Sequence, residues 1–112
     1  MRFDHVAQQV PDIADAVEWW RTRVPGTTVR YQDETWALID AAGVPMSLVM
    51  ADQHPSHLAF RVSDDELERL AAEQGRTVNP HRDGTRSFYA EAPGGQWLEV
   101  IAYPHDEDDR RP

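Results

Sequence analysis

The sequence predicts an α+β fold in which two tandem modules each follow the order β-α-β-β-β. Three observations carry this prediction. Two segments of the first half match two segments of the second half, strand-like and helix-like patterns alternate identically in both halves, and glycines mark equivalent turns. A chain of 112 residues with 40% hydrophobic content can bury one core but not two independent ones. We therefore expect a single domain over residues 1–103, with modules at 1–52 and 53–103.

The internal repeat consists of two ungapped matches. The first, at an offset of 52, pairs His5 with His57, and the second, at an offset of 51, pairs Leu48 with Glu99. The matched segments are residues 4–12 with 56–64 and residues 35–51 with 86–102. Two matches in the same order at nearly equal offsets indicate a duplicated module.

In the first module, a strand at 3–10 precedes a helix that begins behind Asp12 and ends at Pro25-Gly26. The apolar residues of this helix fall at helical spacing: Ile13, Val17, Trp20 and Val24. Three strands complete the module at roughly 27–32, 35–40 and 46–51.

The second module repeats this order. A strand at 57–62 is followed by the capping box Ser63 to Glu66 and by a helix that ends at Gly75. Its last three strands are expected at roughly 76–80, 86–91 and 96–102. The tail at 104–112 has many charges and no apolar residue, so we expect it to be disordered.

Composition excludes several functions. The net charge of −9 argues against binding to a nucleic-acid backbone, which depends on basic side chains. The chain contains no cysteine and no lysine, which removes disulfides, thiol nucleophiles and Schiff-base chemistry. No apolar run has the length of a membrane span, and the N-terminus does not resemble a signal peptide. We expect a cytoplasmic protein that binds neither membranes nor nucleic acid.

Strand parity brings two histidines and a glutamate to one face of the sheet. Successive strand side chains point to opposite faces, and apolar residues of one parity form the face expected under the helices. His5, His57 and Glu99 have the other parity. If the modules pack around a pseudo-twofold axis, these three side chains meet. Two imidazoles and one carboxylate suit one divalent ion, either Fe(II) or Mn, Co, Ni or Zn.

The same parity predicts a small-molecule cavity beside this metal site. One wall should be apolar, formed by Trp36, Leu38, Met46, Leu48 and Met50. The other should carry polar groups, formed by Ser87, Tyr89, Trp97, Glu99 and Ile101.

Further side chains are candidates for contacts with the substrate. Gln9 and Arg61 could contact an anionic or carbonyl group, and Tyr89 could exchange a hydrogen bond with a metal-bound oxygen. Tyr89 and Trp97 could equally be ordinary core aromatics. His54, His81 and His105 are interpreted as ordinary residues of loops or of the tail.

The sequence resembles the vicinal-oxygen-chelate superfamily, which includes glyoxalase I, extradiol dioxygenases, epimerases, fosfomycin-modifying enzymes and bleomycin-binding proteins. The resemblance covers about residues 3–103 and is carried by Asp4-His5-Val6, by Ser56 to Val62 and by Arg86 to Val100 with its Pro-Gly-Gly turn. It implies a mixed sheet that curls around the metal-site cavity, with the helices on its outer face. It also implies assembly as a homodimer.

One departure from the family separates its branches. Leu48 is aligned where glyoxalase I enzymes have a fourth ligand, a glutamate. The remaining three-ligand pattern resembles that of ring-cleaving dioxygenases and fosfomycin-modifying enzymes, and Ser87 and Tyr89 resemble substrate-contacting positions of the latter.

The expected function is therefore a divalent-metal-dependent enzyme acting on a small, oxygen-chelating organic substrate. The reaction would be that of a lyase, isomerase or oxygenase, with Glu99 or Tyr89 moving a proton. The alternative is a metal-independent small-molecule binding protein of the bleomycin-resistance type. A structural partner domain is a third reading, without support beyond the short length.

Overall fold

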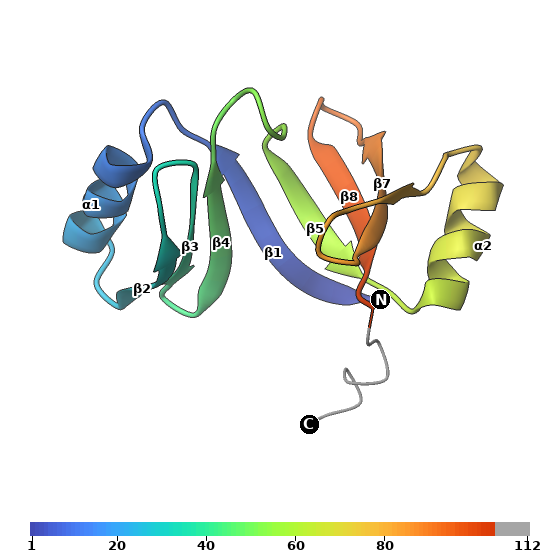
Figure 1. Ribbon diagram of the computed structural model, residues 1–112, viewed down its shortest axis with the longest axis horizontal. Helices are drawn as coiled ribbons and strands as arrows, with labels where there is room; N and C mark the ends of the chain where they lie inside the picture. The colour runs from blue at the N-terminus through green and yellow to red at the C-terminus, as the bar shows by residue number, and fades with distance from the viewer. Residues whose placement is uncertain (105–112) are drawn as a thin grey trace. The chain divides into compact units, whose positions relative to one another are not determined.

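The computed structural model describes residues 1–104, and its elements follow the order β-α-β-β-β twice (Figure 1). These elements are β1 (Arg2–Gln9), α1 (Ile13–Arg23), β2 (Thr27–Gln32), β3 (Trp36–Ala41), β4 (Val44–Val49), β5 (His57–Arg61), α2 (Asp64–Gln74), β6 (Asn79–Pro80), β7 (Arg86–Glu91) and β8 (Trp97–Ala102). The predicted α+β class and the repeated element order are confirmed. The expectation of a disordered tail concerns residues that, apart from Pro104, lie outside the described part.

The chain forms two compact units, each with one helix. The α1 unit comprises residues 5–58, and the α2 unit comprises residues 1–4 and the chain from Ala59 onward. The strand order is β2-β3-β4-β1 in the α1 unit and β1-β5-β8-β7-β6 in the α2 unit. The boundary between the units falls within β1 and within β5, so both strands contribute residues to both units. The boundaries of a single domain stay a prediction.

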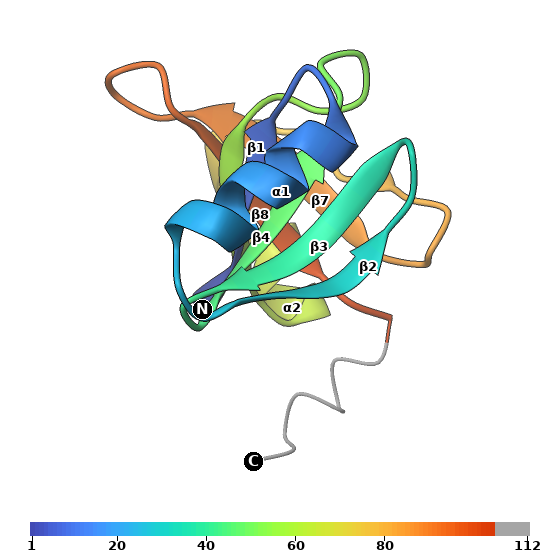
Figure 2. The ribbon, with the colours of Figure 1, turned by 90° about the vertical axis from the view of Figure 1, so that its left-hand side faces the viewer.

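In the α1 unit, β1 runs parallel to β4, whereas β4, β3 and β2 pair antiparallel. The β3–β4 turn is Ala42-Gly43, with φ of 53° and 91°, which suits a two-residue hairpin between twisted strands. Helix α1 begins behind Asp12, whose side chain accepts from Asp15 N at 2.8 Å, and lies across the sheet (Figure 2). Its core consists of Ile13, Val17, Ala37, Ile39, Ala41, Met46 and Leu48.

In the α2 unit, β7 and β8 pair antiparallel, and Val62 N donates to the Ile101 carbonyl at 2.9 Å. Ser63 caps α2 through its hydroxyl, and Gly75 ends the helix in the left-handed conformation, as the sequence predicts. The core under α2 consists of Val62, Leu67, Ala71, Phe88, Ala90, Val100 and Ala102.

Strand β6 is shorter than expected. It covers Asn79–Pro80 rather than 76–80. Arg76 N donates to the Ala71 carbonyl at 2.8 Å, so the start of the expected strand belongs to the end of α2. Pro80 has no N–H to donate and is confined to an edge position. Among the described residues, no helix is long and apolar enough to cross a membrane.

The ungapped alignment of the two modules is wrong by one residue at their last hairpins, β3–β4 and β7–β8. Ala37 pairs with Leu48, and Phe88 pairs with Val100, and all four side chains lie in the cores under the helices. If these two pairs are equivalent, β3 and β7 are offset by 51 positions in the sequence, whereas β4 and β8 are offset by 52. The chain between Phe88 and Val100 is therefore one residue longer than the chain between Ala37 and Leu48, and Ser47 rather than Leu48 corresponds to Glu99.

Candidate metal centre

His5 and His57 approach each other within the α1 unit. Their ring centroids lie 5.6 Å apart at an interplanar angle of 71°, and His57 is only 3% exposed. Two contacts hold the segment before β5 against the end of β1. Gln9 N donates to Ser56 Oγ at 3.0 Å, and Gln9 Nε2 donates to the His54 carbonyl at 2.7 Å. Gln9, predicted to contact substrate, thus positions the loop that leads to His57.

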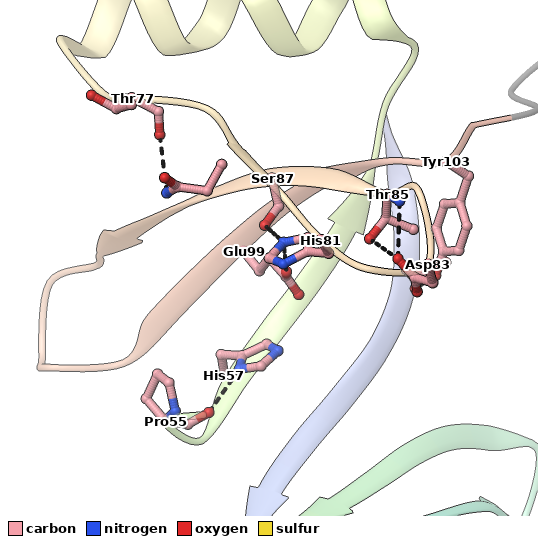
Figure 3. Close-up of polar contacts among 11 residues, drawn as sticks. Pro55, His57, Thr77, His81, Asp83, Thr85, Ser87, Glu99 and Tyr103 are labelled. Carbon is pink, nitrogen blue, oxygen red and sulfur yellow. Dashed lines mark hydrogen bonds and ion pairs between the residues drawn. The ribbon is translucent and has the colours of Figure 1, made fainter. Parts of the chain in front are cut away.

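The hydrogen bond of His57 sets its tautomer. Its Nδ1 lies 2.7 Å from the Pro55 carbonyl oxygen (Figure 3), and because a carbonyl only accepts, Nδ1 carries the proton. The lone pair then resides on Nε2. Metal-binding histidines are commonly oriented in this way, by a backbone carbonyl that receives the second ring N–H. The surroundings of His57 therefore fit a metal ligand.

Glu99 lies on β8 in the α2 unit and is 5% exposed. Its neighbour Val100 packs under α2, so the carboxylate points to the opposite face, as strand parity predicts. Tyr89 is its partner across the β7–β8 ladder and donates a hydrogen bond to it. Burial, followed by the charge and hydrogen bond of Glu99, raises the pKa of Tyr89, so its hydroxyl stays protonated at neutral pH.

His81, which the sequence analysis interprets as an ordinary loop residue, is a neighbour of Glu99. Its Nε2 lies 2.7 Å from Ser87 Oγ and 4.0 Å from Glu99 Oε2 (Figure 3). A tight turn places it there. His81 N donates to the Thr85 carbonyl at 2.8 Å, and Asp83 Oδ1 accepts from the Thr85 amide and hydroxyl. The Asp83-Gly84 pair is a turn signal that could have indicated this return of the chain.

His5, His57 and Glu99 form a His-His-Glu group that could hold a metal ion. Two nitrogens and one oxygen match the donor preferences of Fe(II), Mn, Co, Ni and Zn. A carboxylate as buried as Glu99 needs cationic or hydrogen-bonding partners, which a bound cation would provide.

Arg61 belongs to a second polar cluster of the α2 unit. Its guanidinium carbon lies 3.8 Å from the centroid of the Tyr103 ring, and the Tyr103 hydroxyl donates to Asp4 Oδ2 at 2.7 Å. Burial, followed by the hydrogen bond to Asp4, raises the pKa of Tyr103. The ring therefore stays neutral and supports the cation above it.

The expected apolar wall needs correction at three positions. Met46, Leu48 and Met50 pack with the core under α1, so they do not face the side of the sheet that carries His5. The one-residue shift of the repeat at the hairpin explains this error. Trp36 and Leu38 do lie on the face opposite α1, since Ala37 and Ile39 occupy the core.

The expected polar wall follows the predicted parity. Ser87 and Ile101 are buried outside the α2 core and pair with each other across β7 and β8. Trp97 is half-buried and pairs with Glu91 at the start of β8. A contact of any of these side chains with substrate stays a prediction.

No protein-family profile and no curated protein matches the chain by sequence. Solved structures do match it. A methylmalonyl-CoA epimerase from Mycobacterium tuberculosis is 22% identical, with a TM-score of 0.67 over 96% of this chain and 91% of the epimerase. A point mutant of the Streptomyces coelicolor methylmalonyl-CoA epimerase in complex with 2-nitronate-propionyl-CoA is 18% identical, with a TM-score of 0.66 over 94% and 96% of the two chains.

A homoprotocatechuate 2,3-dioxygenase from Brevibacterium fuscum, also solved as a point mutant, matches as well. It is 15% identical, with a TM-score of 0.64 over 90% of this chain and 33% of the dioxygenase. At these identities the matches show the fold alone. The protein shares its fold of two β-α-β-β-β modules with these epimerases and with part of this dioxygenase.

Proposed function

We propose that the protein is a divalent-metal-dependent enzyme whose small organic substrate binds the ion through two oxygens. The observation that carries the proposal is the His5, His57 and Glu99 group. Three protein ligands leave coordination positions open for a substrate. When bound, the ion would act as a Lewis acid that stabilises negative charge on a substrate oxygen.

The surrounding side chains suit proton transfer. The Tyr89 hydroxyl is held protonated beside Glu99 and can donate, in place of its bond to Glu99, to an oxygen that gains negative charge. Ser87 and His81 add a hydrogen-bonded pair on the same side of Glu99. This set supports an isomerase or lyase that moves a proton next to a carbonyl group, and an oxygenase would use the same ligands. We further propose a cytoplasmic location.

Metal analysis of single-ligand variants tests this proposal. Tag-free protein purified without chelator should contain about one divalent ion per chain, because the three ligands form one site. His5→Ala and Glu99→Gln should each weaken binding by about 100-fold or more, since even changes outside the ligand shell cost roughly 10- to 100-fold. Elemental analysis and titration with Mn(II) give both quantities.

His54→Ala is the matched control. The His54 ring lies 6.4 Å from that of His57, yet His54 is not one of the three proposed ligands. Its substitution should leave the ion content unchanged. A parent protein without affinity for divalent ions would contradict the proposal and favour the metal-independent binding protein.

A further inference from the structure

Two exposed aromatic residues stack at the edge of the α1 unit. The rings of Tyr31 on β2 and Trp36 on β3 lie 4.8 Å apart at an interplanar angle of 31°. Their side chains are 44% and 36% exposed. Single exposed aromatics are ordinary on protein surfaces, but a stacked pair presents a broad flat apolar area to solvent.

One carboxylate holds this pair in place. Asp33 Oδ2 accepts from the Tyr31 hydroxyl, and Asp33 Oδ1 accepts from the Thr35 and Trp36 amides at 2.7 and 3.0 Å. These bonds tie the turn between β2 and β3 to both aromatic residues. A binding surface that is ordered before its ligand arrives loses less entropy on binding.

The strand register places the pair on the same face as His5. An irregularity between Val29 and Tyr31 brings Tyr31 opposite Leu38, on the side of β3 away from α1. Leu38 pairs with Ser47, and Ser47 pairs with Ala7. His5 precedes Ala7 by two residues on β1 and therefore shares its face.

Half-buried residues connect the two ends of this face. Leu38, Ser47 and Pro45 lie between the aromatic pair and His5 in the strand order of the α1 unit. Trp36 pairs with Val49, which pairs with Gln9, so Trp36 is two strand spacings across and four residues along β1 from His5, a separation of roughly 16 Å. A ligand of that length could contact His5 at one end and Trp36 at the other.

We infer that Tyr31 and Trp36 form a stacking subsite for a planar, uncharged ring that the substrate carries roughly 16 Å from its chelating oxygens. This inference rests on the proposed function, because the other end of the substrate is held at the metal. The charges near the pair decide against an anionic ring. Asp33 and Glu34 are exposed beside it, and Arg30, 3.6 Å from Asp40, is already paired with a carboxylate.

The same charges decide against a second copy of the chain as the occupant. A twofold contact through this surface would bring two copies of the Asp33 and Glu34 carboxylates together. Such like-charge contacts destabilise an interface. A neutral ring carries no such cost.

The test uses Mn(II)-loaded protein and three hydroxamates that chelate metal through two oxygens. Acetohydroxamic acid reports the metal site alone, and octanohydroxamic acid is compared with its ω-phenyl derivative by calorimetry. The phenyl group should tighten binding to the parent by roughly tenfold, the gain of one stacking contact. Trp36→Ala should reduce this gain to less than about twofold and leave acetohydroxamic acid binding unchanged.

Trp19→Ala is the matched control, because Trp19 is a 48% exposed tryptophan on α1. It should keep the full phenyl gain. A phenyl group without effect on the parent, or a gain that survives in the Trp36→Ala, Tyr31→Ala double variant, would overturn the inference.

Two further outcomes separate the inference from its alternatives. A Trp36→Ala variant that changes the mass measured by light scattering but keeps the phenyl gain would assign the pair to self-association and overturn the subsite. Failure of acetohydroxamic acid to bind the parent would contradict the metal-dependent function itself, and the subsite would fall with it.

Discussion

Glu99 combines burial with a specific set of neighbours. Its side chain accepts from Tyr89 and lies 4.0 Å from His81, whose ring is bonded to Ser87. Strand parity predicts the direction of this carboxylate from the apolar residues on either side of it. His81 could not be placed in the same way, because parity says nothing about a side chain in a turn.

Alkaline titration provides a prediction at the scale of single residues. The pKa values of the chain's 3 tyrosines are all raised: by burial first at Tyr89 and Tyr103, and by the hydrogen bond to Asp33 first at Tyr31. At pH 10, a tyrosine in the unfolded chain is about half ionised. The native protein should therefore show much less tyrosinate absorbance at pH 10 than the protein in denaturant.

The sign of the linked stability change follows from these shifts. A raised pKa in the folded state means that the unfolded chain loses its tyrosine protons first, so this contribution to stability is present below about pH 10. It should fall as the pH rises toward the higher pKa values of the folded state. Equal tyrosinate absorbance of native and denatured protein at pH 10 would contradict the described environments.

At the scale of elements, the β3–β4 and β7–β8 hairpins differ by one residue, and this difference moves a side chain from one face to the other. Leu48 is fully buried under α1, whereas Ser47 pairs with Leu38 on the face that carries His5. Tyr89 and Glu99 form the corresponding pair in the α2 unit. Adjacent positions of β4 should therefore respond differently to the same substitution.

Glutamate at these two positions tests the register. Leu48→Glu should lower the free energy of unfolding by roughly 3–5 kcal/mol, because an unpaired carboxylate enters the core. Ser47→Glu should fold normally and add a carboxylate on the side of His5. It should bind Mn(II) at least as tightly as the parent and reduce the number of exchangeable waters on the ion.

Denaturant unfolding and water proton relaxation of the Mn(II)-loaded forms measure these effects. A stable Leu48→Glu variant that loses bound water, next to a Ser47→Glu variant without effect, would restore the ungapped register.

The same hairpins show how far sequence reasoning reaches. Helix bounds were predictable because Asp12, Ser63 and Gly75 are chemical signals at the ends of α1 and α2. The faces of β8 were assigned correctly, because the alternation of apolar residues within that strand was sufficient and the repeat was not required. The assignment failed in β4, because a one-residue error in the length of a connection assigns every side chain of the following strand to the wrong face of the sheet. The position of His81 depends on tertiary folding of a turn and could not be obtained from periodicity.

At the scale of the whole molecule, we predict a homodimer, on the basis of the family resemblance and the small size of the chain. Small folds leave apolar surface uncovered, and a twofold assembly is the commonest way to bury it. Light scattering at micromolar concentration should give about twice the chain mass of 12.8 kDa. A mass of a single chain over the whole concentration range would contradict this prediction.

The central claim is that His5, His57 and Glu99 together bind one divalent ion. X-ray absorption spectroscopy of the metal-loaded, tag-free protein tests it most directly, because the spectrum reports the atoms bound to the ion. We predict two imidazole nitrogens with the remaining positions filled by oxygen, and one imidazole fewer in His5→Ala. A first shell of oxygen alone, or an imidazole count unchanged by His5→Ala, would contradict the account.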